Sequence, residues 1–175
     1  MKKKCRKICV ISEMIINLQR IQKQTTKTMK ENTNKNYTTA ELKMELEAAG
    51  VRATAQRVAI LKFMRENPVH PTADVVYEAL SDTIGSLSLT TVYNTLKLFV
   101  EHGLVLMLTI DDTFRCFDGN VAMHAHFMCR ECKKIFDMEM PREVADFAQK
   151  MDGFKVDEVQ LYVKGICENC DINKR

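Results

Sequence analysis

The sequence predicts an α+β fold with two parts in series, which we place at residues 38–118 and 119–175. Apolar residues recur at helical spacing through most of the first part, and two segments that alternate like strands end it. Helices followed by a β-hairpin are typical of a winged helix-turn-helix. The second part has short strands, one helix and two Cys-x-x-Cys pairs, which indicates a small α/β unit held together at its cysteines.

Four helices are expected in the first part, each beginning near a residue that can cap it. They begin near Thr38, at Thr54, at Thr72 and at Ser88 or Thr90, and Gly50, Pro68 and Gly103 end the first, second and fourth. The third helix is expected to bury Val75, Val76, Ala79 and Leu80. Residues 104–109 and 113–117 should then pair as a hairpin across the turn at 110–112.

The second part is expected to contain three strands and one helix. Strands near 126–128 and 134–138 flank the first cysteine pair, and a strand over 156–163 leads into the second. Pro141 is well placed in the first turn of a helix that runs to about residue 151. Few large apolar residues are available here, so a metal staple and pairing with a second copy of the chain would both help this unit to fold.

The cysteine pairs predict a structural zinc site. Two Cys-x-x-Cys pairs supply four thiolates, which suit tetrahedral Zn²⁺ at about 2.3 Å per sulfur. The four ligands would be Cys129, Cys132, Cys167 and Cys170. His124 and His126 stand two residues apart just before the first pair, so on a strand their imidazoles share a face. We expect these histidines to join a second metal site with other ligands.

Composition favours a globular protein in a reducing compartment. Four of the seven cysteines have metal-binding spacing and no secretory signal precedes them, so we expect a cytoplasmic protein rather than a secreted disulfide scaffold. The net charge of +3 comes from a Lys-rich start, which leaves the body acidic. Overall charge therefore gives no support for nucleic-acid binding, and any basic surface must be local.

Residues 1–37 form a basic extension that differs in kind from the rest of the chain. The extension mixes lysines with scattered isoleucines and lacks the uncharged run of a signal peptide or a membrane span. We expect it to be disordered, or to be upstream sequence with translation beginning at Met29. A basic arm that lies on DNA is the alternative.

In order and spacing, these segments resemble the ferric uptake regulator (Fur) family of bacterial metal-dependent repressors. The resemblance covers roughly residues 38–172. Its motifs are Gly-Val-Arg-Ala-Thr-Ala-Gln-Arg at 50–57, His-Pro-Thr-Ala-Asp at 70–74, Ser-Leu-Thr-Thr-Val-Tyr-Asn-Thr-Leu at 88–96, and the two cysteine pairs with their histidines. It implies a homodimer in which the first part reads double-stranded DNA at a palindromic operator and the second part is the dimerisation domain.

The resemblance also implies that the fourth helix enters the major groove, where short polar side chains suit base edges and phosphates. The expected DNA-binding residues are Arg57, Thr90, Thr91, Tyr93, Asn94 and Lys97. Lys62, Arg65 and Arg115 are further candidates for contacts with the DNA backbone. For Tyr93, the alternative is a half-buried packing residue.

By the same resemblance, a regulatory metal lies between the two parts. Carried over position by position, its ligands are His70, Asp118, His124, His126 and Asp137. Three imidazoles and two carboxylates suit Fe²⁺, Mn²⁺ or Zn²⁺, and we expect Fe²⁺ or Mn²⁺ here. Metal binding would tie the parts together, so that metal affinity becomes DNA affinity by linkage.

Asp137 indicates the signal. Iron-responsive members commonly carry Glu at this position, whereas the peroxide-sensing repressor (PerR) branch resembles this chain in carrying Asp. The shorter carboxylate would leave an open position on Fe²⁺, where peroxide is cleaved and oxidises His70 or His124. Oxidation is irreversible, the repressor releases DNA, and oxidative-stress genes are expressed. With Mn²⁺ the protein should repress yet stay insensitive to peroxide.

Other interpretations remain open. An iron- or zinc-responsive repressor of the same family would differ only in its signal. A zinc-stapled interaction module would not bind DNA. A metalloenzyme is disfavoured, because nucleic-acid deaminases pair His-x-Glu with Pro-Cys-x-x-Cys and Ala125 stands where that Glu would be. The sequence also lacks a Gly-rich phosphate loop and a nucleophile elbow, so we expect no enzymatic activity.

Overall fold

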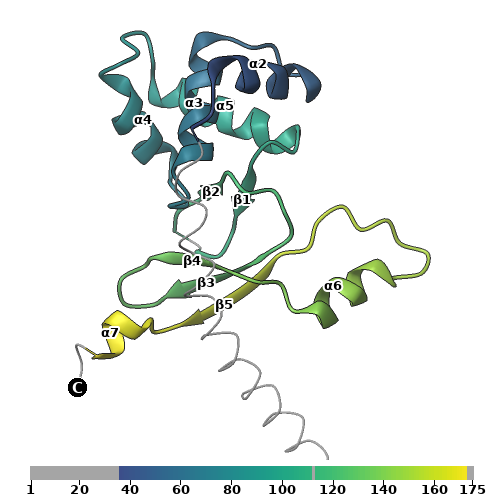
Figure 1. The fold of residues 1–175 in the computed structure, drawn as a ribbon. Helices are drawn as coiled ribbons and strands as arrows, with labels where there is room; N and C mark the ends of the chain where they lie inside the picture. Colours follow the sequence, from purple (N-terminus) through teal and green to yellow (C-terminus); the bar gives the residue numbers. More distant parts are fainter. Residues whose placement is uncertain (1–35, 112, 173–175) are drawn as a thin grey trace, which may run out of the picture.

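The structure, a computed structural model, describes residues 36–111 and 113–172 (Figure 1). The expectations for the N-terminal extension, including a start at Met29, concern residues that lie almost entirely outside this range. The helices of residues 39–101 gather at one end of the molecule, and two small sheets follow them toward the other end, where the later helices lie. The helices are α2 (Thr39–Ala48), α3 (Ala55–Glu66), α4 (Ala73–Ser81) and α5 (Leu89–Glu101).

The predicted starts of these helices are confirmed by their caps. In each case the cap side chain accepts a hydrogen bond from the backbone N–H three residues on, which satisfies one amide that a helix start leaves unpaired. The cap residues are Thr38, Thr54, Thr72 and Ser88. Ser88 rather than Thr90 therefore begins α5. Gly50 has a φ of 75°, which lies in the left-handed region. Helices often end at a residue in this conformation, and glycine adopts it most easily.

The helices and the first sheet enclose one apolar core. Its fully buried members include Leu42, Leu46, Leu61, Val76, Val92, Leu96 and Phe99. The prediction that Val75 and Ala79 face this core was wrong, since both are exposed, Val75 by 44%. Helix α4 instead directs Ala73, Val76 and Leu80 inward, a stripe with the three- and four-residue spacing of one helix face.

The hairpin is shorter than the predicted strands 104–109 and 113–117. Strand β1 (Leu106–Leu108) pairs antiparallel with β2 (Cys116–Asp118). Between the strands, the Asp111 carboxylate accepts a hydrogen bond from the Thr113 N–H at 2.7 Å. This side-chain turn takes the chain out of the ladder before β2 begins, which shortens both strands.

The second sheet has the strand order β4-β3-β5. Strand β3 (Ala125–Cys129) pairs antiparallel with β4 (Ile135–Met138) and parallel with β5 (Leu161–Gly165). The strand predicted over 156–163 begins late, because residues 152–158 are exposed and only β5 pairs with β3. Helices α6 (Arg142–Gln149) and α7 (Glu168–Ile172) complete the order, and no helix among the described residues is long and apolar enough to cross a membrane.

The hairpin packs directly on the three-stranded sheet (Figure 1). Leu108, Ile110 and Cys116 of the hairpin form a buried apolar cluster with Met128 of β3. Partly buried side chains from both sheets surround the cluster: Leu106, Ile135 and Tyr162. Because burial of apolar surface stabilises a contact, this layer holds the hairpin against the sheet.

Gly119 lets the chain leave β2 in close contact with α3. A Cβ at this position would lie 2.2 Å from the Met64 carbonyl oxygen. The Gly119 carbonyl also accepts a hydrogen bond from the Arg65 guanidinium. Since the nearest atoms are backbone atoms of a helix, they cannot move aside as a flexible side chain would. Glycine therefore fixes the path of the chain immediately after Asp118.

Replacing Gly119 by alanine should destabilise the fold. Overpacking against backbone typically costs about 1–3 kcal/mol, and we expect Gly119→Ala to lower the free energy of unfolding by about that amount in urea denaturation followed by circular dichroism. Gly85→Ala is the matched control, because a Cβ at Gly85 meets no atom within 4 Å. Equal stability of the two variants would contradict a close approach that only glycine permits.

Candidate metal centres and exposed helix face

The structure brings the four predicted cysteines together in one cluster. Their sulfur atoms all lie within 4.8 Å of one another, and the Cys132 and Cys167 sulfurs are 3.8 Å apart. Four sulfurs at about 2.3 Å around one ion would be separated by about 3.8 Å, so the spacing fits tetrahedral zinc. All described cysteines are free thiols.

Two turns from different ends of the second part build this cluster. Cys129 ends β3, and the turn after it places Lys133 at a φ of 61° while its N–H donates to Cys129 O at 3.0 Å. The second pair begins just before α7. The Arg130 N–H donates to Gly165 O at 2.7 Å, which joins the two turns. The cysteine cluster is therefore assembled entirely within the second part of the chain.

The backbone around Cys129 favours a thiolate. Burial opposes ionisation of its thiol, but the backbone N–H groups of Cys132 and Cys167 outweigh burial and lower the pKa of Cys129 to about 6. Its contact with the Cys167 N–H is 3.3 Å long. The neighbouring thiols, Cys167 foremost, raise the pKa of Cys170 to about 12. A negative charge settles first on Cys129, which suits the anionic ligand that zinc requires.

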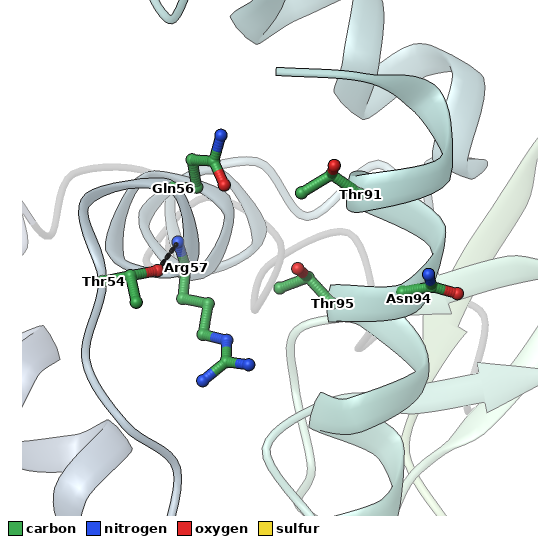
Figure 2. Close-up of a pocket in the computed structure, with 6 residues that line it drawn as sticks. All are labelled: Thr54, Gln56, Arg57, Thr91, Asn94 and Thr95. Carbon is green, nitrogen blue, oxygen red and sulfur yellow. Dashed lines mark hydrogen bonds between the residues drawn. The ribbon is translucent and has the colours of Figure 1, made fainter. Parts of the chain in front are cut away.

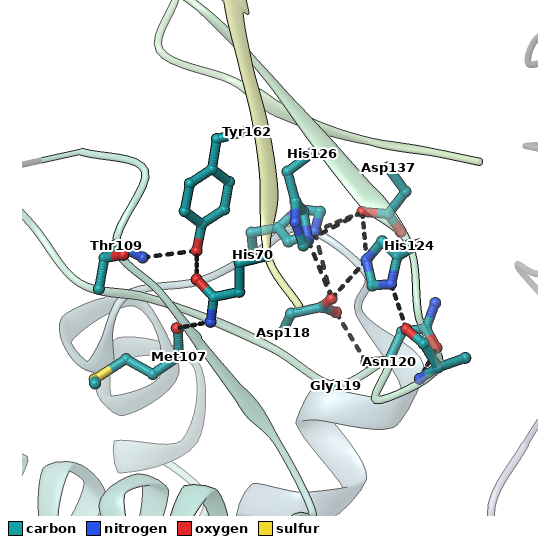
Figure 3. A network of polar contacts seen from close by, with 12 residues as sticks. His70, Met107, Thr109, Asp118, Gly119, Asn120, His124, His126, Asp137 and Tyr162 are labelled. Atoms are coloured by element: carbon teal, nitrogen blue, oxygen red, sulfur yellow. Dashed lines mark hydrogen bonds and ion pairs between the residues drawn. The ribbon is translucent and has the colours of Figure 1, made fainter. Parts of the chain in front are cut away.

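A second cluster joins the two parts of the chain (Figure 3). It contains all five predicted nitrogen and oxygen ligands: His70, Asp118, His124, His126 and Asp137. One ligand atom from each lies within 4.8 Å of the others. His70 precedes α4 and Asp118 ends β2, whereas the other three lie on or next to β3 and β4. The cluster thus spans the contact between the helical part and the three-stranded sheet.

The ligand atoms are close to one another but poorly aligned for direct hydrogen bonds. His70 Nε2 lies 2.6 Å from Asp137 Oδ1, and His124 Nε2 lies 2.9 Å from Asp118 Oδ2. Yet His70 Nε2, His124 Nε2 and Asp137 Oδ1 are buried atoms with no well-formed hydrogen bond among the described residues. Nitrogen and oxygen atoms that lie this close together without hydrogen-bonding one another surround a common point. A cation at that point would satisfy them all.

Burial and backbone strain distinguish this cluster from a surface group of polar residues. His70, Asp118 and His126 are 6%, 2% and 2% exposed. His70 adopts a φ of 50°, which is uncommon for a residue other than glycine and costs free energy. The loop is held there partly by the Phe117 N–H, which donates to Pro71 O at 2.9 Å. The Asp137 side chain is 34% exposed although its Oδ1 is buried, so the cluster lies nearest to solvent at Asp137.

Electrostatics make the cluster attractive to a cation. Burial opposes ionisation of Asp118, but the imidazoles of His124 and His126 beside it outweigh burial and lower the pKa of Asp118 to about 2. The pKa of Asp137 is also lowered, since contacts with His124 and His70 overcome the effect of burial. Contacts with Asp118 and then Asp137 raise the pKa of His124 to about 10. Both carboxylates are therefore ionised inside a buried site that only positive charge can balance.

Helix α5 presents the predicted polar residues on its outer face. Thr90, Tyr93, Asn94 and Lys97 are exposed and Thr91 is partly exposed. Tyr93 is 44% exposed, so it lies at the surface rather than in the core. The opposite face of the helix is buried, with Val92, Leu96 and Phe99 in the apolar core. The outer face is therefore free to meet a partner.

A polar hollow of about 300 Å³ lies between the start of α3 and α5 (Figure 2). Its lining residues are Thr54, Gln56, Arg57, Thr91, Asn94 and Thr95. Sequence reasoning missed Thr95, which lies one helical turn after Thr91, a spacing that places both on one face. Thr95 is only 6% exposed, and its side chain is directed toward α3 (Figure 2).

Arg65 does not match its predicted role as a contact to the DNA backbone. Its guanidinium bonds the Glu45 carboxylate, the Gly119 carbonyl and the Leu104 carbonyl. Only 10% of the side chain is exposed. Arg65 is a structural residue that ties α3 to α2 and to both ends of the hairpin. Lys62 and Arg115 remain exposed.

Comparison with known proteins assigns the chain to a group of regulators. The model of the ferric uptake regulator family matches residues 48–164. The peroxide-responsive repressor PerR of Staphylococcus aureus is 40% identical over 127 residues, which cover 71% of this chain and 86% of that protein. The matched family is one of regulators, and this relative is a repressor.

Two solved structures support the same assignment. The ferric uptake regulator of Pseudomonas aeruginosa with manganese aligns with a TM-score of 0.60 at 26% identity, over 71% of this chain and 96% of that one. The regulator of Francisella tularensis with iron aligns with a TM-score of 0.58 at 25% identity, over 70% and 96% of the two chains.

Removing one cysteine of the cluster should release its metal. We expect Cys132→Ser to lose stoichiometric zinc by atomic absorption and to unfold about 10 °C or more below the unchanged protein, because a structural zinc site contributes several kcal/mol to folding. Cys116→Ser is the matched control for zinc content, since Cys116 lies in the apolar layer and is not one of the four clustered cysteines. Full zinc content in Cys132→Ser would contradict the assignment.

Proposed function

Since this chain belongs to the ferric uptake regulator family, we propose that it is a metal-dependent DNA-binding repressor that senses peroxide. Oxidation of a histidine in the five-residue cluster would release the protein from DNA and allow oxidative-stress genes to be expressed. The observation that carries the proposal is the convergence of five nitrogen and oxygen atoms from both parts of the chain on one buried point.

The five-residue cluster would act as a clamp between the parts. His70 and Asp118 come from the helical part and its hairpin, and His124, His126 and Asp137 come from the sheet. Fe²⁺ or Mn²⁺ held by all five would favour the arrangement in which the hairpin lies on the sheet. This arrangement fixes the direction of α5, so metal binding and DNA binding strengthen each other by linkage.

The chemistry of peroxide sensing depends on which residues lie near Asp137, where the five-residue cluster is nearest to solvent. When bound, Fe²⁺ would catalyse cleavage of the peroxide oxygen–oxygen bond, and the imidazole ring would supply the two electrons. One peroxide oxygen would be added to the imidazole of His70 or His124, and the other would leave as water. An oxidised ring has lost its shape and basicity as a ligand. The clamp would then fail for good, because no proton transfer reverses this addition.

Asp137 supports peroxide as the signal. Its carboxylate is the most exposed of the ligands, at 34% of the side chain, and the Staphylococcus aureus relative at 40% identity is a peroxide-responsive repressor. A specific observation also favours a second candidate, a repressor that responds to metal supply. The aligned regulators from Pseudomonas aeruginosa and Francisella tularensis were solved with manganese and with iron.

DNA recognition would rest on the outer face of α5. Thr90, Tyr93, Asn94 and Lys97 are exposed along it, as base-edge and phosphate contacts require. The hollow beside α5 would seat one backbone phosphate, with Arg57 and Thr91 among the donors. Helix N-termini favour such anions, and the hollow lies at the start of α3. Two such surfaces in a homodimer would suit a palindromic operator.

The second part would serve as the dimerisation domain, over residues 119–175, with the first domain over 38–118. Large apolar side chains remain exposed in it, including Phe147 at 67% and Phe154 at 73%, and a second copy of the chain would cover them. Zn²⁺ at the cysteine cluster would hold this domain together. The free thiols of the described residues fit a cytoplasmic protein.

Peroxide should act only on the iron-loaded protein. We expect the Fe²⁺-loaded protein to lose DNA binding on brief peroxide treatment, with the mass of one oxygen atom added to the peptide of His70 or His124. The Mn²⁺-loaded protein should retain DNA binding and gain no oxygen, because Mn²⁺ does not readily reduce peroxide. Gel shift and peptide mass spectrometry provide the two measurements.

Asp137→Glu is the matched variant for this experiment. The longer carboxylate should fill more of the open side, so oxygen addition should slow by about tenfold or more, which corresponds to about 1.4 kcal/mol in the barrier. Asp146→Glu, at an exposed position on α6, should behave as the unchanged protein does. Persistent DNA binding without oxygen addition in the Fe²⁺-loaded protein would favour the metal-supply alternative.

Arg57 should contribute to DNA affinity without contributing to sequence preference. Loss of one phosphate contact in Arg57→Ala should weaken binding to all DNA sequences alike. The slope of log affinity against log salt should become shallower by about 1. Fluorescence anisotropy at several salt concentrations measures both. Lys155→Ala removes an exposed cation in the second part and should leave the slope unchanged; a similar change in both variants would sink the assignment.

A further inference from the structure

A second attachment joins the hairpin to the three-stranded sheet, beside the five-residue cluster and separate from its ligands. The Thr109 N–H donates a hydrogen bond to the Tyr162 hydroxyl at 3.1 Å (Figure 3). The Gln160 carboxamide donates to the Met107 carbonyl at 3.3 Å. Both side chains therefore reach across from β5, or the residue before it, to the backbone of the hairpin.

Tyr162 and Gln160 bind the Thr109 N–H and the Met107 carbonyl, which lie along the free edge of the hairpin. Within residues 36–111 and 113–172, strand β1 pairs only with β2, so no described strand lies beside its other edge. Unpaired N–H and C=O groups at such an edge seek partners. Tyr162 and Gln160 supply them, and the Tyr162 hydroxyl also donates to Gln160 Oε1. The tyrosine hydroxyl thus both accepts and donates, and each side chain holds the other in place.

Tyr162 stands in the same row of the sheet as two ligands. Across the strands, His126 is paired with Asp137 on one side and with Tyr162 on the other. Residues paired in this way direct their side chains to the same face, and the rings of His126 and Tyr162 are 6.0 Å apart. One row of the sheet therefore carries two ligands and the tyrosine, all facing the hairpin.

Because of this row, the hydrogen bonds of Tyr162 and Gln160 and the five-residue cluster all require the hairpin to lie on the sheet. Tyr162 also packs on the apolar layer around Leu108 and Met128, which fills the space between hairpin and sheet. If the hairpin moved away from the sheet, the Thr109–Tyr162 bond would break and Asp118 would leave His126. Each attachment therefore favours the position of the hairpin that the other attachment needs.

We propose that Tyr162 and Gln160 form a latch that holds the hairpin on the sheet and so sets how tightly the five-residue cluster binds its metal. The inference rests on the proposed role of that cluster as a clamp. Latch and metal favour the same closed arrangement, so each strengthens the other. A protein with a weaker latch needs more metal to reach the same closed fraction. Tyr162 and Gln160 are positioning residues, and neither belongs to the five-residue cluster itself.

Tyr162→Phe tests the latch, because it removes the hydroxyl and keeps the ring. The expected result is a rise of about 3- to 10-fold in the Mn²⁺ dissociation constant, measured by calorimetry on the zinc-loaded protein without DNA, as expected from the loss of one or two hydrogen bonds. The Thr109 amide should also exchange with solvent faster in NMR experiments. DNA affinity at saturating Mn²⁺ should equal that of the unchanged protein, since metal then fills the closed state.

Two further variants separate the latch from a general loss of stability. Tyr77→Phe is the matched control: Tyr77 is partly buried on the helical core, its hydroxyl makes no hydrogen bond among the described residues, and its removal should leave Mn²⁺ affinity within about twofold. Gln160→Ala, at an exposed position, should weaken Mn²⁺ binding as Tyr162→Phe does. Unchanged Mn²⁺ affinity and Thr109 exchange in both latch variants would overturn the proposal.

The same measurements separate failure of the latch from failure of the proposed function. If the unchanged protein binds DNA equally with and without Mn²⁺, the proposed repressor mechanism fails. The Mn²⁺ constants and the Thr109 exchange rates are obtained without DNA, so they still decide whether the latch exists. If DNA binding depends on Mn²⁺ but the latch variants bind Mn²⁺ normally, the repressor mechanism stands and the latch fails.

Discussion

The convergence of two ionised carboxylates and three imidazoles on one buried point is the constraint on which the arrangement of the molecule depends. Negative charge in a site where Asp118 is 2% exposed is costly unless positive charge lies beside it. The ligand atoms come from the loop before α4, the end of β2, two strands of the other sheet and the residue just before β3. Their charges can be balanced together only when the hairpin lies on that sheet. The electrostatics of the cluster therefore favour one relative position of the two parts.

The two clusters differ in what they hold together. The four cysteines join the end of β3 to the start of α7, both within the second part. A metal there supports that part whether or not the helices are nearby. The five-residue cluster crosses from one part to the other, and it includes His70 in a strained conformation with a φ of 50°. Strain of this kind is retained where surrounding contacts impose it. The proposed staple and the proposed clamp thus differ in where their residues lie in the chain, as well as in sulfur versus nitrogen and oxygen chemistry.

Local pattern was enough to predict some features of the structure. The helix starts follow from capping residues such as Ser88, whose effect extends only one turn. The membership of both clusters was predicted from cysteine spacing and from family resemblance. Features that depend on contacts between distant segments were missed. Arg65 looked like a surface cation, yet it meets Glu45, Leu104 and Gly119 from three other segments. The late start of β5 depends on which residues β3 can pair with, which the alternation over 156–163 does not reveal.

The position of Tyr162 likewise depends on contacts between distant segments, and here those contacts bear on function. In sequence it is an ordinary strand aromatic, and only the register of β5 against β3 sets it beside His126. That register puts three kinds of contact on one sheet face: ligands at Asp137 and His126, an apolar layer around Met128, and hydrogen bonds at Tyr162. The apolar layer and the hydrogen bonds need no metal, so they give the closed arrangement a stability of its own. Metal binding then needs to contribute only the remaining free energy of closure, which is the repulsion between the two carboxylates less the stability that these contacts give. The proposed latch would therefore let substitutions at Tyr162 or Gln160 change the metal concentration that the protein requires without altering a ligand.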